Sequence, residues 1–352
     1  MPRQGKLHHL TNRIPGQIYL WLAIPIFGAS SAVTRRLTEI GAQNFVNGQN
    51  PISLCNVLFV GNLCALMVLM LLYGREWQPT TLRQLSRKDW LSLVIVAILS
   101  GALAPGLIFQ ALALTKVNNV VLVGRLEPPL TLALSVWFLR ERVNGWEIVG
   151  AIASFIGVVL TIFLQPPETN MMQVGGFSIG VGELLVAIAA LALAVSTIIG
   201  KKRLSKVPLG IYSIVRTGLG TAVFFVSALV LYGSHHFMDV LSPFLWQWML
   251  AYGVVIVVVG QSLWTAGLRA STVSTASIVS SFTPVAGIVA AYLVLGEVPS
   301  AAQYLGGSVI LIGIVVSQVG IHKKTSRRVT ETSVSSMQAE QAIAGKVGFK
   351  GI

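Results

Sequence analysis

Long apolar stretches alternate with short polar ones along almost the whole chain. A helix needs about 20 mainly apolar residues to cross the roughly 30 Å of hydrocarbon in a bilayer. The stretches that meet or approach this length are Gly16–Thr34, Pro51–Gly74, Trp90–Thr115, Val117–Leu139, Ile148–Gln165, Leu184–Gly200, Leu209–Gly233, Phe244–Leu268, Thr272–Gly296 and Pro299–Gln318. The pattern predicts an all-α integral membrane protein with ten transmembrane helices.

The second half of the chain repeats the first. Pro284 lies 156 positions after Pro128, and the same spacing relates Glu297 to Glu141 and Gly306 to Gly150. The helix-start signals also correspond, with Asn144-x-x-Glu147 opposite Ser300-x-x-Gln303. Both have the capping-box form, in which a short polar side chain and a Glu or Gln three residues later satisfy free N–H groups. We therefore expect two related halves.

The repeat divides the chain into segments. We expect a cytoplasmic N-terminal segment (1–15), two five-helix repeats (16–165 and 177–320), a linker (166–176) and a tail (321–352). The tail is polar and has no aromatic residue before Phe349, which favours disorder. Basic residues before the first stretch resemble a signal peptide. We expect that stretch to be retained, because its loss would remove the counterpart of the sixth stretch.

Composition and charge agree with a membrane protein. Hydrophobic residues make up 54% of the chain and charged residues 11%, whereas a soluble domain has about a quarter charged residues. The net charge of +13 comes from Lys and Arg in short loops and tails on one side of the stretches. This distribution follows the positive-inside rule and gives no reason to expect a nucleic-acid partner.

The same distribution predicts the orientation. Both termini are expected to be cytoplasmic in a multi-pass protein of the plasma (inner) membrane. Five spans per repeat is an odd number, so the second repeat would be inverted relative to the first. Inverted repeats are the architecture of many secondary transporters, whose substrate site lies near the membrane midplane between the halves.

Motifs for cofactor chemistry are absent from the sequence. There is no P-loop, HExxH, GxSxG or Cys/His cluster, so we expect no cofactor, no metal and no direct use of ATP. Cys55 and Cys64 are nine positions apart in one apolar stretch and would point to opposite faces of a helix. They are not expected to form a disulfide.

The repeated block resembles the EamA domain of the drug/metabolite transporter superfamily. The residues that carry the resemblance are Ala111-Leu112, Leu126-Glu127-Pro128, Phe138-Leu139-Arg140-Glu141-Arg142, Gly150 and Ile156-Gly157-Val158-Val159, and in the second half Phe282-Thr283-Pro284, Leu295-Gly296-Glu297, Gly306 and Ile312-Gly313-Ile314. It covers roughly residues 18 to 320. The resemblance implies ten helices, a central cavity lined by the first four helices of each half, and transport of small organic solutes such as amino acids, other metabolites and drugs.

One feature departs from the family pattern and bears on the site. An Arg often found in the second helix of each half is present here only as Arg216, while the second stretch has Asn56 nearby. Arg125, Glu127 and Arg216 would be charged groups inside the membrane, where charge is costly and usually functional. Arg216 is the candidate partner for Glu127, and functional and purely structural roles remain open for both. For Arg125, snorkelling towards the interface is favoured.

Proline and polar residues complete the candidate site. Pro128 and Pro284 interrupt corresponding spans and are the candidate hinge, since helix breaks at matching positions of two halves mark the binding region. Polar groups on the helices expected to line the cavity are further substrate-binding candidates, namely Asn56, Gln110, Gln261, Trp264 and Ser280. Glu141, Glu297 and Glu183 stand at span ends, where we expect them to act as structural anchors that complement the positive end of a following helix.

The leading hypothesis is a secondary transporter, not an enzyme, that exports a small metabolite such as an amino acid by alternating access about Pro128 and Pro284. Protons are a candidate coupling ion, and both a monomer and a homodimer remain open. The alternatives are a membrane-embedded enzyme, a lipid flippase and a non-transporting scaffold. An enzyme would need a paired acid and base or metal ligands within the bilayer, and the sequence offers one deep carboxylate and no histidine in a span.

Overall fold

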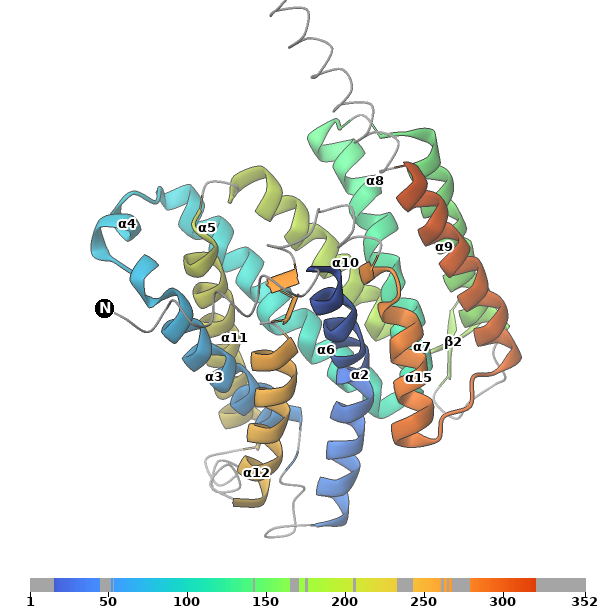
Figure 1. The fold of residues 1–352 in the computed structure, drawn as a ribbon, viewed down its shortest axis with the longest axis horizontal. Helices are drawn as coiled ribbons and strands as arrows, with labels where there is room; N and C mark the ends of the chain where they lie inside the picture. The colour runs from blue at the N-terminus through green and yellow to red at the C-terminus, as the bar shows by residue number, and fades with distance from the viewer. Residues whose placement is uncertain are drawn as a thin grey trace, which may run out of the picture.

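The protein is a bundle of helices that follow the predicted stretches in order (Figure 1). The computed structural model describes residues 16–44, 52, 54–141, 143–164, 171–174, 177–204, 207–232, 243–260, 263–264, 266–267 and 279–320. The N-terminal segment and the tail, with the predictions that concern them, lie outside these residues. Within them, seven helices are long and apolar enough to cross a membrane. The chain is therefore a helical, multi-pass membrane protein.

The first half contains helices that change type partway through a span. Its elements are α2 (Gly16–Gln43), α3 (Leu54–Tyr73), η1 (Gly74–Glu76), α4 (Pro79–Arg83), α5 (Arg87–Val96), the π-helical η2 (Ala97–Leu103), α6 (Ala104–Leu114), α7 (Val117–Val123), the 3-10 turn η3 (Gly124–Leu126), α8 (Glu127–Leu139) and α9 (Gly145–Phe163). α5, η2 and α6 follow one another without a break, as do α7, η3 and α8.

The second half begins with α10 (Val181–Arg203) and α11 (Leu209–Tyr232). Next come α12 (Pro243–Tyr252), the π-helical η5 (Gly253–Gly260), α15 (Thr283–Leu295) and the helix Ala301–Gly320. The predicted stretch Thr272–Gly296 is seen only in its second part, because residues 268–278 lie outside the described chain. The predicted linker contains β1 (Met171–Val174), which pairs with β2 (Phe177–Gly180) as an antiparallel hairpin leading into α10.

The first helix is longer than predicted and extends to Gln43 rather than ending near Thr34. The polar residues beyond Thr34 are satisfied along the helix. Arg35 forms an ion pair with Glu39 at 3.3 Å and donates hydrogen bonds to the carbonyls of Leu112 and Thr115 at 2.7 and 2.6 Å. These bonds tie the end of α2 to the end of α6, so the helix continues where hydropathy alone would end it.

Contacts between the halves recur in matched pairs (Figure 1). α2 packs along α15, and its counterpart α10 packs along α8. Likewise α10 packs along η2, while α2 packs along η5. α3 packs along its own counterpart α11, and α7 in the fourth span packs along α15 in the ninth, which is the corresponding span. Each half therefore presents equivalent faces to the other.

Glycine faces bring α9 and the helix Ala301–Gly320 into backbone contact. A Cβ atom at Gly157 would lie 2.6 Å from the carbonyl oxygen of Gly306. A Cβ atom at Gly313 would lie at the same distance from the carbonyl oxygen of Gly150. Small residues at such a contact let the backbones of two membrane-spanning helices approach closely.

Candidate functional site

Two consecutive prolines break the fourth span at the start of α8. Proline has no N–H and cannot donate to the carbonyl four residues earlier, so Pro128 and Pro129 interrupt the helical ladder. The chain responds with the 3-10 turn η3, in which Glu127 N–H bonds back to the carbonyl of Gly124. The carbonyl of Arg125 loses its usual donor, which would have been the N–H of residue 129. The break therefore leaves a polar backbone group and two charged side chains at one point of the span.

The ninth span is broken at the corresponding position. A turn at Ser281–Phe282 precedes α15, and Pro284 occupies the first turn of that helix. Thr283 bonds through its hydroxyl to the carbonyl of Ser280 at 2.7 Å. Helix interruptions at Pro128 and Pro284 agree with the expectation drawn from the repeat, although their role as a hinge stays a prediction.

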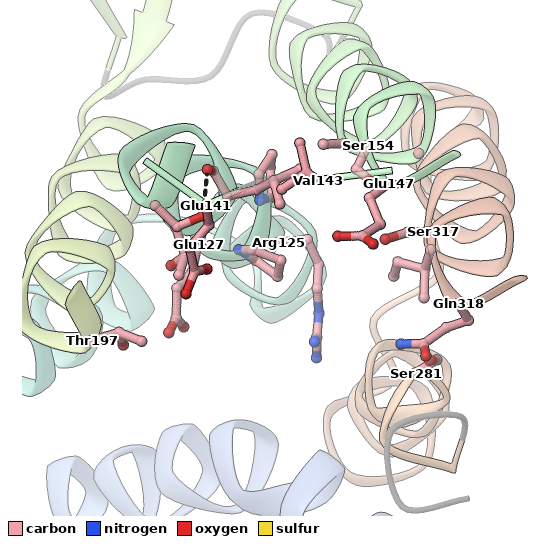
Figure 2. Close-up of a pocket in the computed structure, with 18 of the residues that line it drawn as sticks. Arg125, Glu127, Glu141, Val143, Glu147, Ser154, Thr197, Ser281, Ser317 and Gln318 are labelled. Carbon is pink, nitrogen blue, oxygen red and sulfur yellow. Dashed lines mark hydrogen bonds between the residues drawn. The ribbon is translucent and has the colours of Figure 1, made fainter. Parts of the chain in front are cut away.

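Two adjoining cavities meet at the first break. The larger, of about 1030 Å³, lies between α8, α9, α10, the residues before α15 and the helix Ala301–Gly320 (Figure 2). The smaller, of about 250 Å³, lies between α2, α6, η3, α10 and α15. Arg125, Glu127 and Pro128 line both. The larger cavity alone is near the upper end of the range of roughly 300–1,000 Å³ that is typical of small-molecule sites.

The larger cavity has a polar lining with an excess of acidic groups. Its charged residues are Arg125, Glu127, Glu141, Glu147 and Lys201, three carboxylates against two cations. Glu141 and Lys201 form an ion pair of 2.7 Å at the exposed mouth. Glu127 interacts electrostatically with the guanidinium group of Arg125. The neutral polar lining residues are Thr131, Ser135, Ser154, Thr197, Ser280, Ser281, Ser317 and Gln318.

Several predicted site residues therefore come together. Arg125, Glu127, Pro128 and Ser280 line the larger cavity. Trp264 packs edge-on against Phe27, which lines the smaller cavity, at a ring-centroid distance of 6.2 Å. Trp264 thus supports the cavity wall.

Other predicted site residues lie elsewhere. Gln110 is exposed on α6, and neither Gln110 nor Arg216 lines the two cavities. Asn56 lies in α3, but its side chain, like all of Gln261, lies outside the described residues. Their substrate-binding roles stay predictions without a described contact.

The expected pairing of Arg216 with Glu127 does not occur among the described residues. α11 packs along α3 and η2, and the Arg216 backbone sits so close to Gly101 that a Cβ there would be 2.5 Å from the Arg216 carbonyl oxygen. The Arg216 side chain is exposed. Glu127 instead interacts electrostatically with Arg125, which lies two positions before it in the sequence.

Buried polar side chains close the end of the bundle where α7 begins. Glu183 is 2% exposed and accepts hydrogen bonds from Thr115 Oγ1 at 2.5 Å and from Asn119 Nδ2 at 2.6 Å. Gln303 Nε2 donates to Asn119 Oδ1, also at 2.5 Å. These bonds join the first half, through Thr115 and Asn119, to the second half, through α10 and the helix Ala301–Gly320. We call Thr115, Asn119, Glu183 and Gln303 the polar latch.

The span-end carboxylates act across the halves, unlike the sequence expectation. Glu297 accepts the backbone N–H groups of Val117 and Asn118 at 3.2 and 3.3 Å, so it caps α7 of the other half rather than the helix that follows it. Glu141 pairs with Lys201 on α10. Both are anchors, as expected, but they fasten one half to the other.

One capping prediction is right and its counterpart is wrong. Ser300 N–H donates to Gln303 Oε1 at 2.8 Å and Gln303 N–H donates to Ser300 Oγ at 3.3 Å, which completes the predicted box. Among the described residues Asn144 makes no side-chain cap bond, and the Glu147 side chain turns into the larger cavity rather than back to the Asn144 backbone (Figure 2). The capping pattern concealed this lining residue. The sequence holds one sign of this difference, because the first half has a charged residue, Glu147, at the position where the second half has the neutral Gln303.

Most of the chain is similar to known transporters. The model of the EamA-like transporter family matches residues 15–163 and 180–318. A protein of Synechocystis sp. named an uncharacterized transporter is 46% identical over 340 residues, which cover 97% of this chain and 96% of that protein. An uncharacterized transporter of Clostridium kluyveri is 24% identical over 319 residues, 90% of this chain and 98% of the relative. The protein PecM of Dickeya dadantii is 26% identical over 233 residues, 65% of this chain and 73% of that protein. A crystal structure with 18% sequence identity matches at a TM-score of 0.50 over 87% of this chain and 98% of the other, so only the fold is shared.

Proposed function

We propose, from the premise that this chain belongs to the EamA-like transporter family, that it is a secondary transporter working by alternating access between two halves. The halves are residues 16–165 and 177–320, with five transmembrane helices each, and the second is inverted in the membrane. The matched contacts between the halves support two equivalent units. The odd number of spans per unit supports their inversion. The excess of Lys and Arg on one side supports cytoplasmic termini in the plasma (inner) membrane.

The described state is open at one end and closed at the other. Along the fourth span, the polar latch at Thr115 and Asn119 comes first, the smaller cavity next, and the larger cavity last. The larger cavity reaches the surface where the Glu141–Lys201 pair is exposed. In the proposed orientation that end is cytoplasmic, so this is the inward-open state. Transport requires the polar latch to break and the Glu141 end to close.

The transported solute is small and polar. The cavity size suits a small organic molecule, and the hydroxyl-rich lining offers hydrogen bonds to one. Arg125, Glu127 and the carbonyl freed by Pro129 form the centre of the site, where both cavities meet. We propose a metabolite such as an amino acid or related compound, moved out of the cytoplasm without chemical change. Glu127 is half-buried, so it can take up and release a proton during the cycle.

The observation that carries this proposal is the meeting of both cavities at a proline-broken helix carrying two charged side chains. The test is solute flux into and out of proteoliposomes across a metabolite panel, with and without a pH gradient. We expect saturable flux of a subset of solutes. Arg125→Ala should abolish that flux, while Arg36→Ala, which removes the same charge from the exposed end of α2 outside both cavities, should retain it.

Three outcomes would overturn the proposal. Absence of flux for every solute, with the protein folded and correctly inserted, would favour a scaffold. Transbilayer movement of labelled lipid without solute flux would favour a flippase. Flux that survives Arg125→Ala but is lost in Arg216→Ala would move the site to α11.

A further inference from the structure

Glu147 is a carboxylate that the fold leaves without a partner. It is 9% exposed, on the first turn of α9, and lines the larger cavity. Among the described residues its side chain has no hydrogen bond and no ion pair. The other two carboxylates of the cavity each interact with a cation. Glu141 forms an ion pair with Lys201, and Glu127 interacts electrostatically with Arg125. Burying a charged group without a partner is costly.

The repeat shows what Glu147 would do if its role were only structural. At the matching position of the second half, Gln303 completes a capping box with Ser300 and also donates to Asn119. Asn144 could offer Glu147 the same local partner, because its backbone angles of φ −80° and ψ 148° suit a helix cap. The bond is not made, and the carboxylate instead points into the cavity beside Ser317 (Figure 2).

The chemistry of the surroundings indicates what Glu147 would bind. The lining has three carboxylates and two cations, so one negative charge is unbalanced. Ser154 on α9 and Ser317 on the last helix also line the cavity and offer hydroxyl groups to a ligand. A carboxylate with nearby hydroxyls is a suitable acceptor set for a protonated amine, whose N–H groups form charge-assisted hydrogen bonds. No cation of the described protein fills that role.

We infer that Glu147 is the binding residue for a cationic amine group of the transported solute, inside the larger cavity. This inference rests on the proposed function and narrows its substrate class to organic amines. The rest of the solute then extends towards Arg125 and the helix break.

Equilibrium binding to the purified full-length protein tests this inference without requiring transport. The probes are phenethylamine, protonated at pH 7, and N-acetylphenethylamine, a neutral analogue of similar shape. Wild-type protein should bind the amine and bind the neutral analogue at least 10-fold more weakly. Glu147→Gln should weaken amine binding about 10- to 100-fold, as expected for loss of a charge-assisted hydrogen bond, and leave the analogue unchanged. Glu147→Asp should restore part of the affinity.

Glu39→Gln is the matched control, because it removes the same charge from the far end of α2, where Glu39 pairs with Arg35 and Arg36 outside both cavities. It should leave amine binding unchanged. Thermal unfolding of each variant identifies loss of fold. If Glu147 only stabilised the first turn of α9, Glu147→Gln would lower the melting temperature and leave amine affinity unchanged, which would overturn the inference.

The outcome separates this inference from the proposed function. Equal binding of both probes by wild-type protein, or no binding of either, overturns the amine site even if proteoliposomes transport another solute. Glu147-dependent amine binding without any solute flux leaves the site standing and overturns the transporter.

Discussion

The glycine contact between α9 and the last helix permits a quantitative test of the packing. In Gly157→Ala, the new Cβ would lie 2.6 Å from the carbonyl oxygen of Gly306 and 2.7 Å from the backbone nitrogen of Ile310. Ordinary van der Waals contact begins near 3.4 Å, so the two helices must separate by about 0.8 Å along that direction. The clashing atoms belong to the backbone and cannot move aside as a side chain would. Overpacking of this kind costs about 1–3 kcal/mol.

Helix propensity opposes the clash but is smaller. Replacing Gly by Ala inside a helix favours the helix by about 0.5–1 kcal/mol. The net expected loss is therefore about 0–2.5 kcal/mol. Gly145→Ala is the matched control, since a Cβ at Gly145 meets nothing within 4 Å. The free energy of unfolding, measured by denaturant titration in detergent micelles, should be lower for Gly157→Ala than for Gly145→Ala. Equal stability of the two variants, or a more stable Gly157→Ala, would refute the described contact.

Three further predictions concern single side chains. Ser300→Ala should lower the free energy of unfolding by about 0.5–2 kcal/mol, because it removes a formed cap, whereas Asn144→Ala should change it little; equal losses in denaturant titrations would contradict this. Asn118 is fully buried and neither polar atom of its side chain has a partner among the described residues, so Asn118→Leu should leave the free energy of unfolding unchanged or raise it by about 1–3 kcal/mol, and a large loss in the same titration would contradict this. Glu127→Gln should retain solute binding but lose any pH dependence of proteoliposome flux, and an unchanged pH profile would exclude Glu127 as the proton site.

Features that depend on periodicity and local chemistry could be predicted from the sequence. The apolar stretches and the repeat predicted the order of the helices and the breaks at Pro128 and Pro284. The capping box at Ser300 and Gln303 was also predicted, because it depends on two residues three positions apart. These features arise from neighbours in the chain or from the 156-residue repeat, and both are visible in one sequence.

Features that depend on which helices meet could not be predicted in the same way. Arg216 and Glu127 were paired because both charges lie within the membrane, but α11 packs on α3 and η2, away from η3. Glu297 caps a helix of the other half, a contact between residues 180 positions apart. Glu147 fits a capping box in sequence, yet its side chain points into the larger cavity beside α9.

Alternating access requires that the two ends of the fourth span open in turn. In a variant with Cys55 and Cys64 replaced, single cysteines at Ser281, in the larger cavity, and at Asn118, beside the polar latch, would be labelled with a membrane-impermeant thiol reagent. We predict that the cysteine at 281 is labelled from the cytoplasmic face and the cysteine at 118 is protected. A transported solute, present on both sides, should lower labelling at 281 and raise labelling at 118 from the opposite face. Labelling of both positions from one face, or no change at either position with a transported solute, would contradict alternating access between inverted halves.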